Sequence, residues 1–209
     1  MTVVIDKEES MAGTPGEAAD SRGKLVAGAA DMIRRRGLNA TSVRELAKYA
    51  RAPLGSTYHY FPGGKTQLAT EAVTFAGDLA ATLLARELDR GPIEGMRAFL
   101  QMWRKVVVDT DFRAGCPVLA VAVEDLPEAE GAPREAAAAA FSRWTELLTD
   151  SMCAHGAERA EAERTATLIV AAVEGSVAMC RAQQSAEPLD RIATQLEPLV
   201  RSTITRDRI

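Results

Sequence analysis

The 209-residue chain has little of what zinc-binding, disulfide-bonded or catalytic domains rely on. Its three cysteines, Cys116, Cys153 and Cys180, are widely spaced, form no CxxC pair and have no zinc-binding spacing with His59 or His155. A glycine-rich phosphate loop, an HExxH motif and a nucleophile elbow are also missing. We therefore expect reduced, partly buried thiols, no metal, no cofactor and no catalytic site.

Long apolar runs and a secretory signal are absent as well. No stretch of the sequence reads as long enough to span a bilayer. The first twenty residues contain acidic side chains and no basic start followed by an apolar segment. Hydrophobic residues make up 47% of the chain and charged residues 26%, which is typical of a soluble globular protein. These observations predict a cytoplasmic protein with no membrane partner.

Charge is distributed unevenly along the chain. Residues 21–70 include nine basic and two acidic residues and so have a net charge of +7. Because the whole chain has a net charge of −4, the remaining residues together carry −11. A basic first quarter on an acidic body indicates one end suited to a polyanion. The alternative at this point is a basic face that is merely solvated.

Helical periodicity runs through the chain, and no strand-type alternation competes with it. Apolar residues recur at helical spacing from Val26 to Ile33, and Gly37 ends this first helix. Helices are predicted over about 22–36, 43–50, 53–60, 65–88, 92–108, 117–124, 134–152, 158–184 and from 188 onward. We expect an all-α fold of about nine helices, divided into a disordered tail (1–20), a three-helix head (21–66) and a helical body (67–209).

The head has the pattern of a helix-turn-helix, in which a tight turn joins the second and third of three short helices. Ser42 lies three residues before Glu45, a capping box that starts the second helix. Pro53 suits the first turn of the third helix. That third helix, Leu54–Tyr60, is short and uncharged enough to enter a major groove.

Small and polar side chains of the third helix are the candidates for base contacts. Gly55 allows close approach, and Leu54 can touch a thymine methyl group. Ser56, Thr57 and His59 can hydrogen-bond at base edges, whereas Tyr58 is expected to face the core of the head. For Ser56 and Thr57 the alternative is that they only solvate the helix. Phosphate contacts are expected from Thr41, Ser42, Arg44, Arg51, Tyr60 and Lys65.

These residues resemble the signature of the TetR family over about fifty positions. The resemblance rests on the order and spacing of Thr41–Ala47, Ala50, Gly55–Phe61 and Gly64–Leu68. The family usually has glycine where Arg51 stands, so either this turn has another shape or Arg51 compensates through a phosphate contact. The stretch Phe112–Val118, together with Glu174 and Gly175, also resembles the LmrA/YxaF-like subgroup. The resemblance implies a dimeric, nine-helix repressor that a ligand releases from its operator.

The body is expected to pair two heads, because a palindromic operator needs two reading helices about 34–36 Å apart. The last two helices have surplus apolar surface that suits a four-helix dimer interface. The expected dimer contacts are Val170, Ala171, Val177, Ala178, Leu189, Ile192, Leu196 and Leu199. The alternative is that these side chains pack within their own chain.

A sensor pocket is also expected in the body. Large apolar side chains that could line it are Met96, Phe99, Trp103, Phe112, Phe141, Trp144 and Met179. The alternative for each is ordinary core packing. Glu174 stands alone in an apolar run, so it either orients a polar or cationic ligand or is paired at the dimer interface. The expected effector is small and largely apolar or aromatic.

The sequence thus predicts a ligand-responsive transcriptional regulator, acting as a repressor on double-stranded operator DNA as a homodimer. The long helix from Lys65 is expected to transmit ligand binding, because it is continuous with head and body. Two rival interpretations stay open: a helical enzyme, and a nonspecific DNA-binding or adaptor protein.

Overall fold

The computed structural model describes residues 15–50, 52–126 and 131–205, and the regular secondary structure in these ranges is entirely α-helical. The helices are α1 (Pro15–Arg36), α2 (Val43–Tyr49), α3 (Leu54–Tyr60), α4 (Gly64–Leu88), α5 (Pro92–Asp109), α6 (Pro117–Ala122), α7 (Ala132–Ala154), α8 (Arg159–Gln183) and α9 (Glu187–Thr205). The prediction of an all-α fold with about nine helices is therefore confirmed for the described ranges.

The helix bounds follow the predicted ranges closely except at the N-terminus. Helix α1 begins at Pro15, so the last six residues of the predicted disordered tail are helical. Residues 1–14 of that tail lie outside the described residues. Gly37, with φ +81°, ends α1 in the left-handed region that glycine adopts without strain, as predicted.

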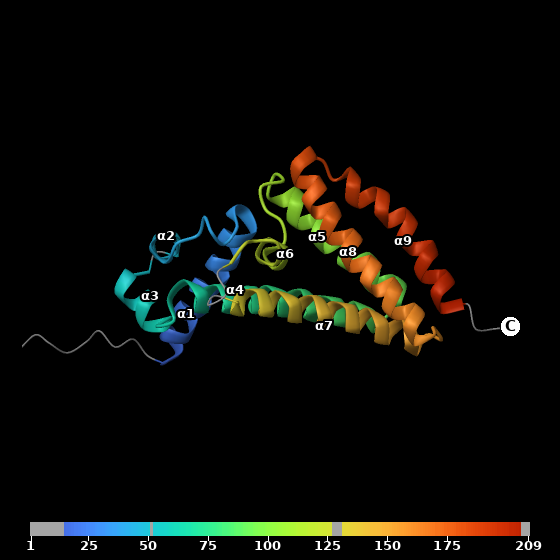
Figure 1. The fold of residues 1–209 in the computed structure, drawn as a ribbon, viewed down its shortest axis with the longest axis horizontal. Helices are drawn as coiled ribbons and strands as arrows, with labels where there is room; N and C mark the ends of the chain where they lie inside the picture. The colour runs from blue at the N-terminus through green and yellow to red at the C-terminus, as the bar shows by residue number, and fades with distance from the viewer. Residues whose placement is uncertain (1–14, 51, 127–130, 206–209) are drawn as a thin grey trace, which may run out of the picture.

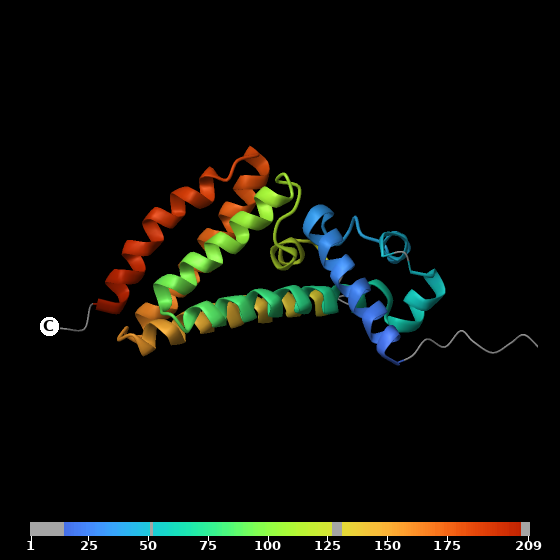
Figure 2. The ribbon, with the colours of Figure 1, turned by 180° about the vertical axis from the view of Figure 1, so that it is seen from behind.

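The molecule has a small head at one end of a two-armed body (Figure 1). Helices α2 and α3 lie in the head beside α1, and the body consists of two diverging arms. Helices α4 and α7 run side by side as one arm, and α5, α8 and α9 form the other. The arms meet at the end far from the head and diverge toward α1 and α6, as the reverse view also shows (Figure 2).

Close packing of α4 on α7 fixes the first arm. A Cβ atom added at Gly77 would lie 2.7 Å from the Ala140 side chain, so glycine is what permits this approach. The indole Nε1 of Trp144 donates a hydrogen bond to the Gly77 carbonyl at 3.0 Å. Trp144 also packs edge-on against Phe99 and Trp103 of α5, with ring centroids 5.6 and 6.3 Å away. These aromatic contacts join the two arms through one core.

Two helices, α4 and α8, are long and apolar enough to cross a membrane by length and composition. This differs from the expectation that no such segment exists. The most apolar stretches of α4 and α8 are 44% and 50% buried inside the fold, respectively. Both helices therefore serve as core helices here, which accounts for their apolar composition.

The head is tied to the body through α6. The Gly115 backbone N–H donates to the Arg34 carbonyl at 2.9 Å, at the end of α1. The Glu124 carboxylate, just after α6, accepts hydrogen bonds from the backbone N–H groups of Leu38 and Asn39 at 2.9 and 3.1 Å. Hence α1 and the turn that follows it are attached directly to the body, independently of α4.

Candidate nucleic-acid interface and effector cleft

Helix α2 begins as the capping pattern predicts. Ser42 is the N-cap residue, with extended backbone angles, and its Oγ accepts a hydrogen bond from the Glu45 N–H at 3.1 Å. The hydroxyl is also 3.1 Å from the Glu45 carboxylate. The first turn of α2 is thereby satisfied locally, which stabilises this short helix directly before the turn into α3.

The exposed face of α3 differs in part from the predicted one. Gly55, Tyr58 and His59 are exposed and share one side of the helix, at i, i+3 and i+4. Tyr58 is 53% exposed, so the prediction that it faces the core is wrong. Thr57 is completely buried, and its Oγ1 donates to the Pro53 carbonyl at 3.2 Å. The prediction that Thr57 reads bases is therefore wrong as well.

The burial of Thr57 has a simple physical reason. Its hydroxyl bonds to a carbonyl one turn earlier in its own helix, so the polar group is satisfied without water and the methyl group packs inward. The other predicted base-contacting residues, Leu54 and Ser56, are half-buried at the sides of α3. Open space surrounds the Cα of Gly55, so nothing within the protein obstructs approach from outside at this point.

The predicted phosphate contacts fall into three groups. Arg44 and Ser42 are exposed on α2 and at its start, and Tyr60 is half-buried at the end of α3. Thr41 is buried, and its Oγ1 donates to the Gly37 carbonyl at 2.8 Å, which contradicts a phosphate contact from this side chain. The remaining members are Lys65, whose Nζ donates to the Asn39 carbonyl at 3.4 Å, and Arg51, which lies outside the described residues.

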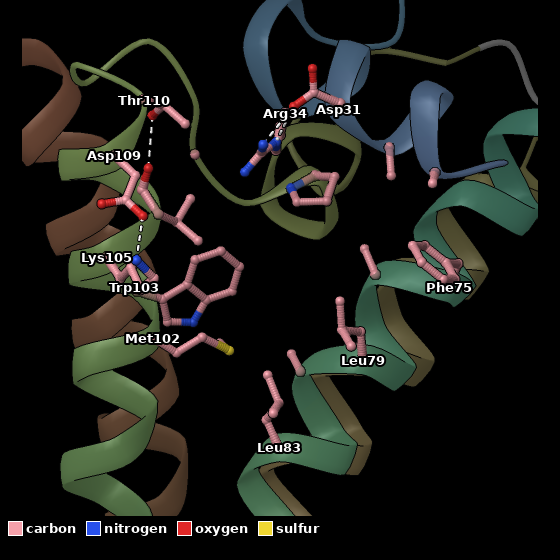
Figure 3. A pocket seen from close by; sticks show the side chains of 17 residues that line it. Asp31, Arg34, Phe75, Leu79, Leu83, Met102, Trp103, Lys105, Asp109 and Thr110 are labelled. Atoms are coloured by element: carbon pink, nitrogen blue, oxygen red, sulfur yellow. Dashed lines mark hydrogen bonds and ion pairs between the residues drawn. The ribbon is translucent and has the colours of Figure 1, made fainter. Parts of the chain in front are cut away.

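A cleft of about 480 Å³ opens where the arms diverge, between α1, α4, α5 and the start of α6 (Figure 3). Most of the side chains that line it are apolar. They are Ala27, Ala30, Phe75, Ala76, Leu79, Ala80, Leu83, Met102, Trp103, Val106 and Pro117, joined by Asp31, Arg34, Lys105, Asp109, Thr110 and Gly115. Because α1 belongs to the head, the cleft is walled by head and body together.

The charged residues of the cleft neutralise one another. Arg34 donates to the Asp31 carboxylate at 2.8 Å on α1, and Lys105 Nζ lies 2.6 Å from the Asp109 carboxylate on α5. The Trp103 indole projects from α5 toward α4 (Figure 3), and its Nε1 is buried with no hydrogen-bond partner among the described residues. The lining therefore combines apolar walls with two internal ion pairs.

Comparison with known proteins places the two parts of the chain in related families. Residues 25–72 match the family described as bacterial regulatory proteins, tetR family, and residues 92–195 match the LmrA/YxaF-like transcriptional regulator C-terminal domain. The uncharacterized HTH-type transcriptional regulator Rv0196 of Mycobacterium tuberculosis is 39% identical over 183 residues, covering 86% of this chain and 93% of its own. The chain belongs to the TetR family of transcriptional regulators. Its resemblance to that family and to the LmrA/YxaF-like subgroup is thus confirmed.

Other relatives agree with this assignment. The uncharacterized HTH-type regulator YxaF of Bacillus subtilis is 31% identical over 184 residues, covering 87% of this chain and 96% of its own. A TetR transcriptional regulator from Legionella pneumophila has the same fold, with a TM-score of 0.77 at 18% identity over 91% of this chain and 98% of its own. The family models and the curated relatives describe transcriptional regulators and not enzymes, which speaks against the helical-enzyme interpretation.

The cleft of this TetR-family regulator contains one of the residues predicted to bind ligand, Trp103. Met96, Phe99 and Trp144 are buried in the core, and Phe141 is half-buried against it. The others do not line the cleft either: Phe112 is half-buried after α5, Met179 is 49% exposed on α8, and Glu174 is buried. The wall of the cleft is formed instead by Phe75 and aliphatic residues of α4 and by small residues of α1, none of which was predicted to bind ligand.

Glu174 occupies neither of the two positions expected for it. It is 3% exposed, so it does not face a partner subunit, and it is absent from the cleft lining. Neither carboxylate oxygen has a hydrogen-bond partner among the described residues. Burial raises the pKa of Glu174 to about 8, and the neighbouring Cys116 thiol acts in the opposite direction. Burial also raises the pKa of Cys116 well above its ordinary value, so both groups are protonated at neutral pH.

The predicted dimer contacts divide into core and surface residues. Val170, Val177, Leu189 and Leu196 are buried within the chain, and Ile192 and Leu199 are half-buried against the core, so only Ala171 and Ala178 of the predicted set are exposed. They share one side of α8 with three further exposed residues, Leu168, Gly175 and Met179. We call this set, Leu168, Ala171, Gly175, Ala178 and Met179, the α8 face.

Proposed function

We propose that this TetR-family chain is a ligand-responsive repressor that binds a palindromic operator as a homodimer in the cytoplasm. The observation that carries the proposal is the cleft, because its walls come from both the DNA-binding head and the body. A molecule bound there contacts α1 directly, so its binding energy depends on how the head sits on the body. The division into a head (21–66) and a body (67–209) is part of this proposal.

The surface of α3 supports operator recognition by Gly55, Tyr58 and His59. Side chains of this kind donate and accept hydrogen bonds at base edges, while glycine leaves room for the groove. Residues 21–70 carry a net charge of +7, which supplies sequence-independent attraction to phosphate. In this proposal Tyr58, and not Thr57, is a base-contacting residue of α3.

The α8 face supports a homodimer. Its apolar and small side chains are exposed along one stripe, and a Cβ atom at Gly175 would meet nothing within 4 Å in the chain. Such a stripe allows two helices to approach closely and bury apolar surface. Two heads held by this interface would read the two half-sites of one operator.

The effector is proposed to be small, largely apolar and without net charge. The ion pairs of the cleft already satisfy its charged residues, and most of the other side chains that line it are apolar. Occupation of the cleft would favour a body conformation in which α4 and α1 carry the heads out of register. Coupling of this kind amounts to about 1–3 kcal/mol.

In vitro selection of operator sequences followed by footprinting tests the DNA-binding part of the proposal. We expect protection of one inverted repeat, whereas protection independent of sequence would support the nonspecific DNA-binding alternative. Sedimentation equilibrium tests the dimer: Leu168→Glu should give monomers, and Ala138→Glu, on an exposed position of α7, should not.

A thermal-shift screen of neutral apolar compounds tests the effector part. Compounds that stabilise the protein should also release the selected operator, because binding to one state shifts the equilibrium toward it. Leu79→Glu places a charge on the apolar wall of the cleft and should abolish both effects. Stabilisation that survives Leu79→Glu would place the binding site elsewhere.

A further inference from the structure

One carboxylate of α1 lies between the cleft and the second helix of the head. Asp31 lines the cleft, and its side chain is only 17% exposed (Figure 3). It accepts hydrogen bonds from Arg34 at 2.8 Å and Arg35 at 2.9 Å on its own helix. It also accepts one from the hydroxyl of Tyr49, in the last turn of α2, at 2.8 Å. Asp31 thus belongs to the cleft wall and to the α1–α2 contact at once.

The electrostatic environment keeps Asp31 ionised. Burial raises its pKa, but hydrogen bonds from Arg35, Arg34 and Tyr49 together bring the pKa below its ordinary value. The same bond raises the pKa of Tyr49, because a phenol that donates to a carboxylate holds its proton more firmly. A charge-assisted bond of this kind is stronger than a bond between neutral groups, so it contributes to the angle between α1 and α2.

Tyr49 is well placed to set the orientation of α3. Its ring lies close to α1, 3.3 Å from where a Cβ atom at Gly28 would be, although the residue is 58% exposed overall. Beyond Tyr49 the chain passes into α3 through a short turn, in which Ala52 N–H donates back to the Ala47 carbonyl of α2 at 2.8 Å. Since α3 follows α2 through this tight connection, a change at Tyr49 moves the helix that carries Tyr58 and His59.

We propose that Asp31 is the positioning residue through which occupation of the cleft alters the reading head, by way of its bond to Tyr49. This inference rests on the proposed effector role of the cleft. A molecule that fills the cleft displaces the Asp31–Arg34 pair from its wall, and the Tyr49 hydroxyl loses its acceptor. Helix α2 is then less firmly held on α1, and α3 loses its operator-binding orientation. This connection acts in addition to α4.

A covalent probe tests the proposal without an identified ligand. Leu79, which is 53% exposed on the cleft wall, is changed to cysteine in a Cys153→Ser background and labelled with pyrenyl maleimide. Operator affinity is compared between labelled and unlabelled protein, by fluorescence anisotropy of the selected DNA. We expect the label to weaken binding by roughly tenfold or more, within the range of typical allosteric coupling. The same label on Ala138→Cys of α7 should change it less than about twofold.

The deciding measurement is the ratio of the operator dissociation constants of the labelled and the unlabelled protein when both also carry Tyr49→Phe. Phenylalanine keeps the ring against α1 and removes only the hydroxyl, so we expect the ratio to fall to less than about threefold. Thr82→Val, which removes an exposed hydroxyl that donates to the Asp78 carbonyl of its own helix, should leave the full ratio. A ratio isolates coupling, since a general loss of head stability weakens labelled and unlabelled protein alike.

Each result has a definite meaning. An undiminished effect of the label in Tyr49→Phe would overturn the role of Asp31 and leave the cleft as an effector site. No effect of the label at Leu79→Cys in any background would overturn the effector cleft and this inference with it. If Tyr49→Phe fails to fold by circular dichroism, Asp31→Asn provides the second variant, because it removes the charge that strengthens the bond while keeping the shape of the side chain.

Discussion

Replacing Glu174 with glutamine should raise the free energy of unfolding at neutral and alkaline pH but not at pH 4. In the folded chain this buried carboxyl keeps its proton up to about pH 8, whereas an unfolded chain loses it near 4.5. Between these values the folded state binds one more proton than the unfolded state, so stability falls as the pH rises. Below 4.5 both states are protonated and no penalty exists.

The size of the effect follows from the width of this window. Each pH unit within it corresponds to about 1.4 kcal/mol, which gives a penalty of about 3 kcal/mol at pH 7 and about 5 kcal/mol at pH 8. Glutamine has nearly the same shape and does not titrate. Its buried amide adds a cost that is independent of pH. The informative quantity is therefore how much the difference in the free energy of unfolding between mutant and wild type changes from pH 4 to pH 8.

Urea denaturation at pH 4, 5, 6, 7 and 8 measures this difference, at one protein concentration because a dimer links stability to concentration. Glu146→Gln, on an exposed position of α7, is the matched control and should run parallel to the wild type. If the free energy of unfolding of Glu174→Gln also runs parallel to that of the wild type from pH 4 to pH 8, the reasoning is refuted, since Glu174 would then be solvated or paired in the folded protein.

Four further predictions concern the head, the α4–α7 contact and the attachment of the head. Tyr58→Ala should relax base preference by about 1–3 kcal/mol at particular operator positions, measured by competition binding. Thr57→Val should cost about 0.5–1.5 kcal/mol in thermal or urea unfolding and leave base preference the same, because the hydroxyl bond to the Pro53 carbonyl is lost while the Thr57 backbone N–H still donates to that carbonyl. Gly77→Val should destabilise the fold by about 1–3 kcal/mol in urea, because the added carbons meet Ala140, and equal stability would disprove the close approach. Glu124→Ala should speed amide hydrogen exchange at Leu38 and Asn39, and unchanged exchange would argue against the attachment through Glu124.

Local patterns in the sequence were enough to predict most helices of the described ranges and the start of the head. Ser42 and Glu45 stand at capping distance, and Gly37 supplies a positive φ, so both signals depend on residues within one turn of each other. The same holds for α3 as an element, since Pro53 and the residues after it define it locally. The family signature depends on the same local spacings, which is why the sequence alone reveals it.

Which side of each helix meets another helix depended on the tertiary structure. Thr57 and Tyr58 are adjacent in α3. The sequence predicted that the aromatic Tyr58 is buried and the polar Thr57 exposed, but the reverse holds, because the Thr57 hydroxyl is satisfied within its own helix. In the same way Val177 is core and Met179 is surface on α8, although both are apolar. Periodicity locates the buried face of a helix that has one apolar stripe. Helix α8 is apolar on more than one side, so periodicity does not tell which side is buried.

The sequence by itself determined the class of this protein: a basic helix-turn-helix on an acidic, all-helical body, because capping, glycine turns and charge are written in short stretches of residues. Only the tertiary structure decided that α1 forms one wall of the cleft, that Asp31 lies between that cleft and Tyr49, and that Glu174 is buried with no hydrogen-bond partner among the described residues. Each of these features depends on how residues of different helices are brought together. Their meeting depends on how all the helices pack together, and no single segment contains that information.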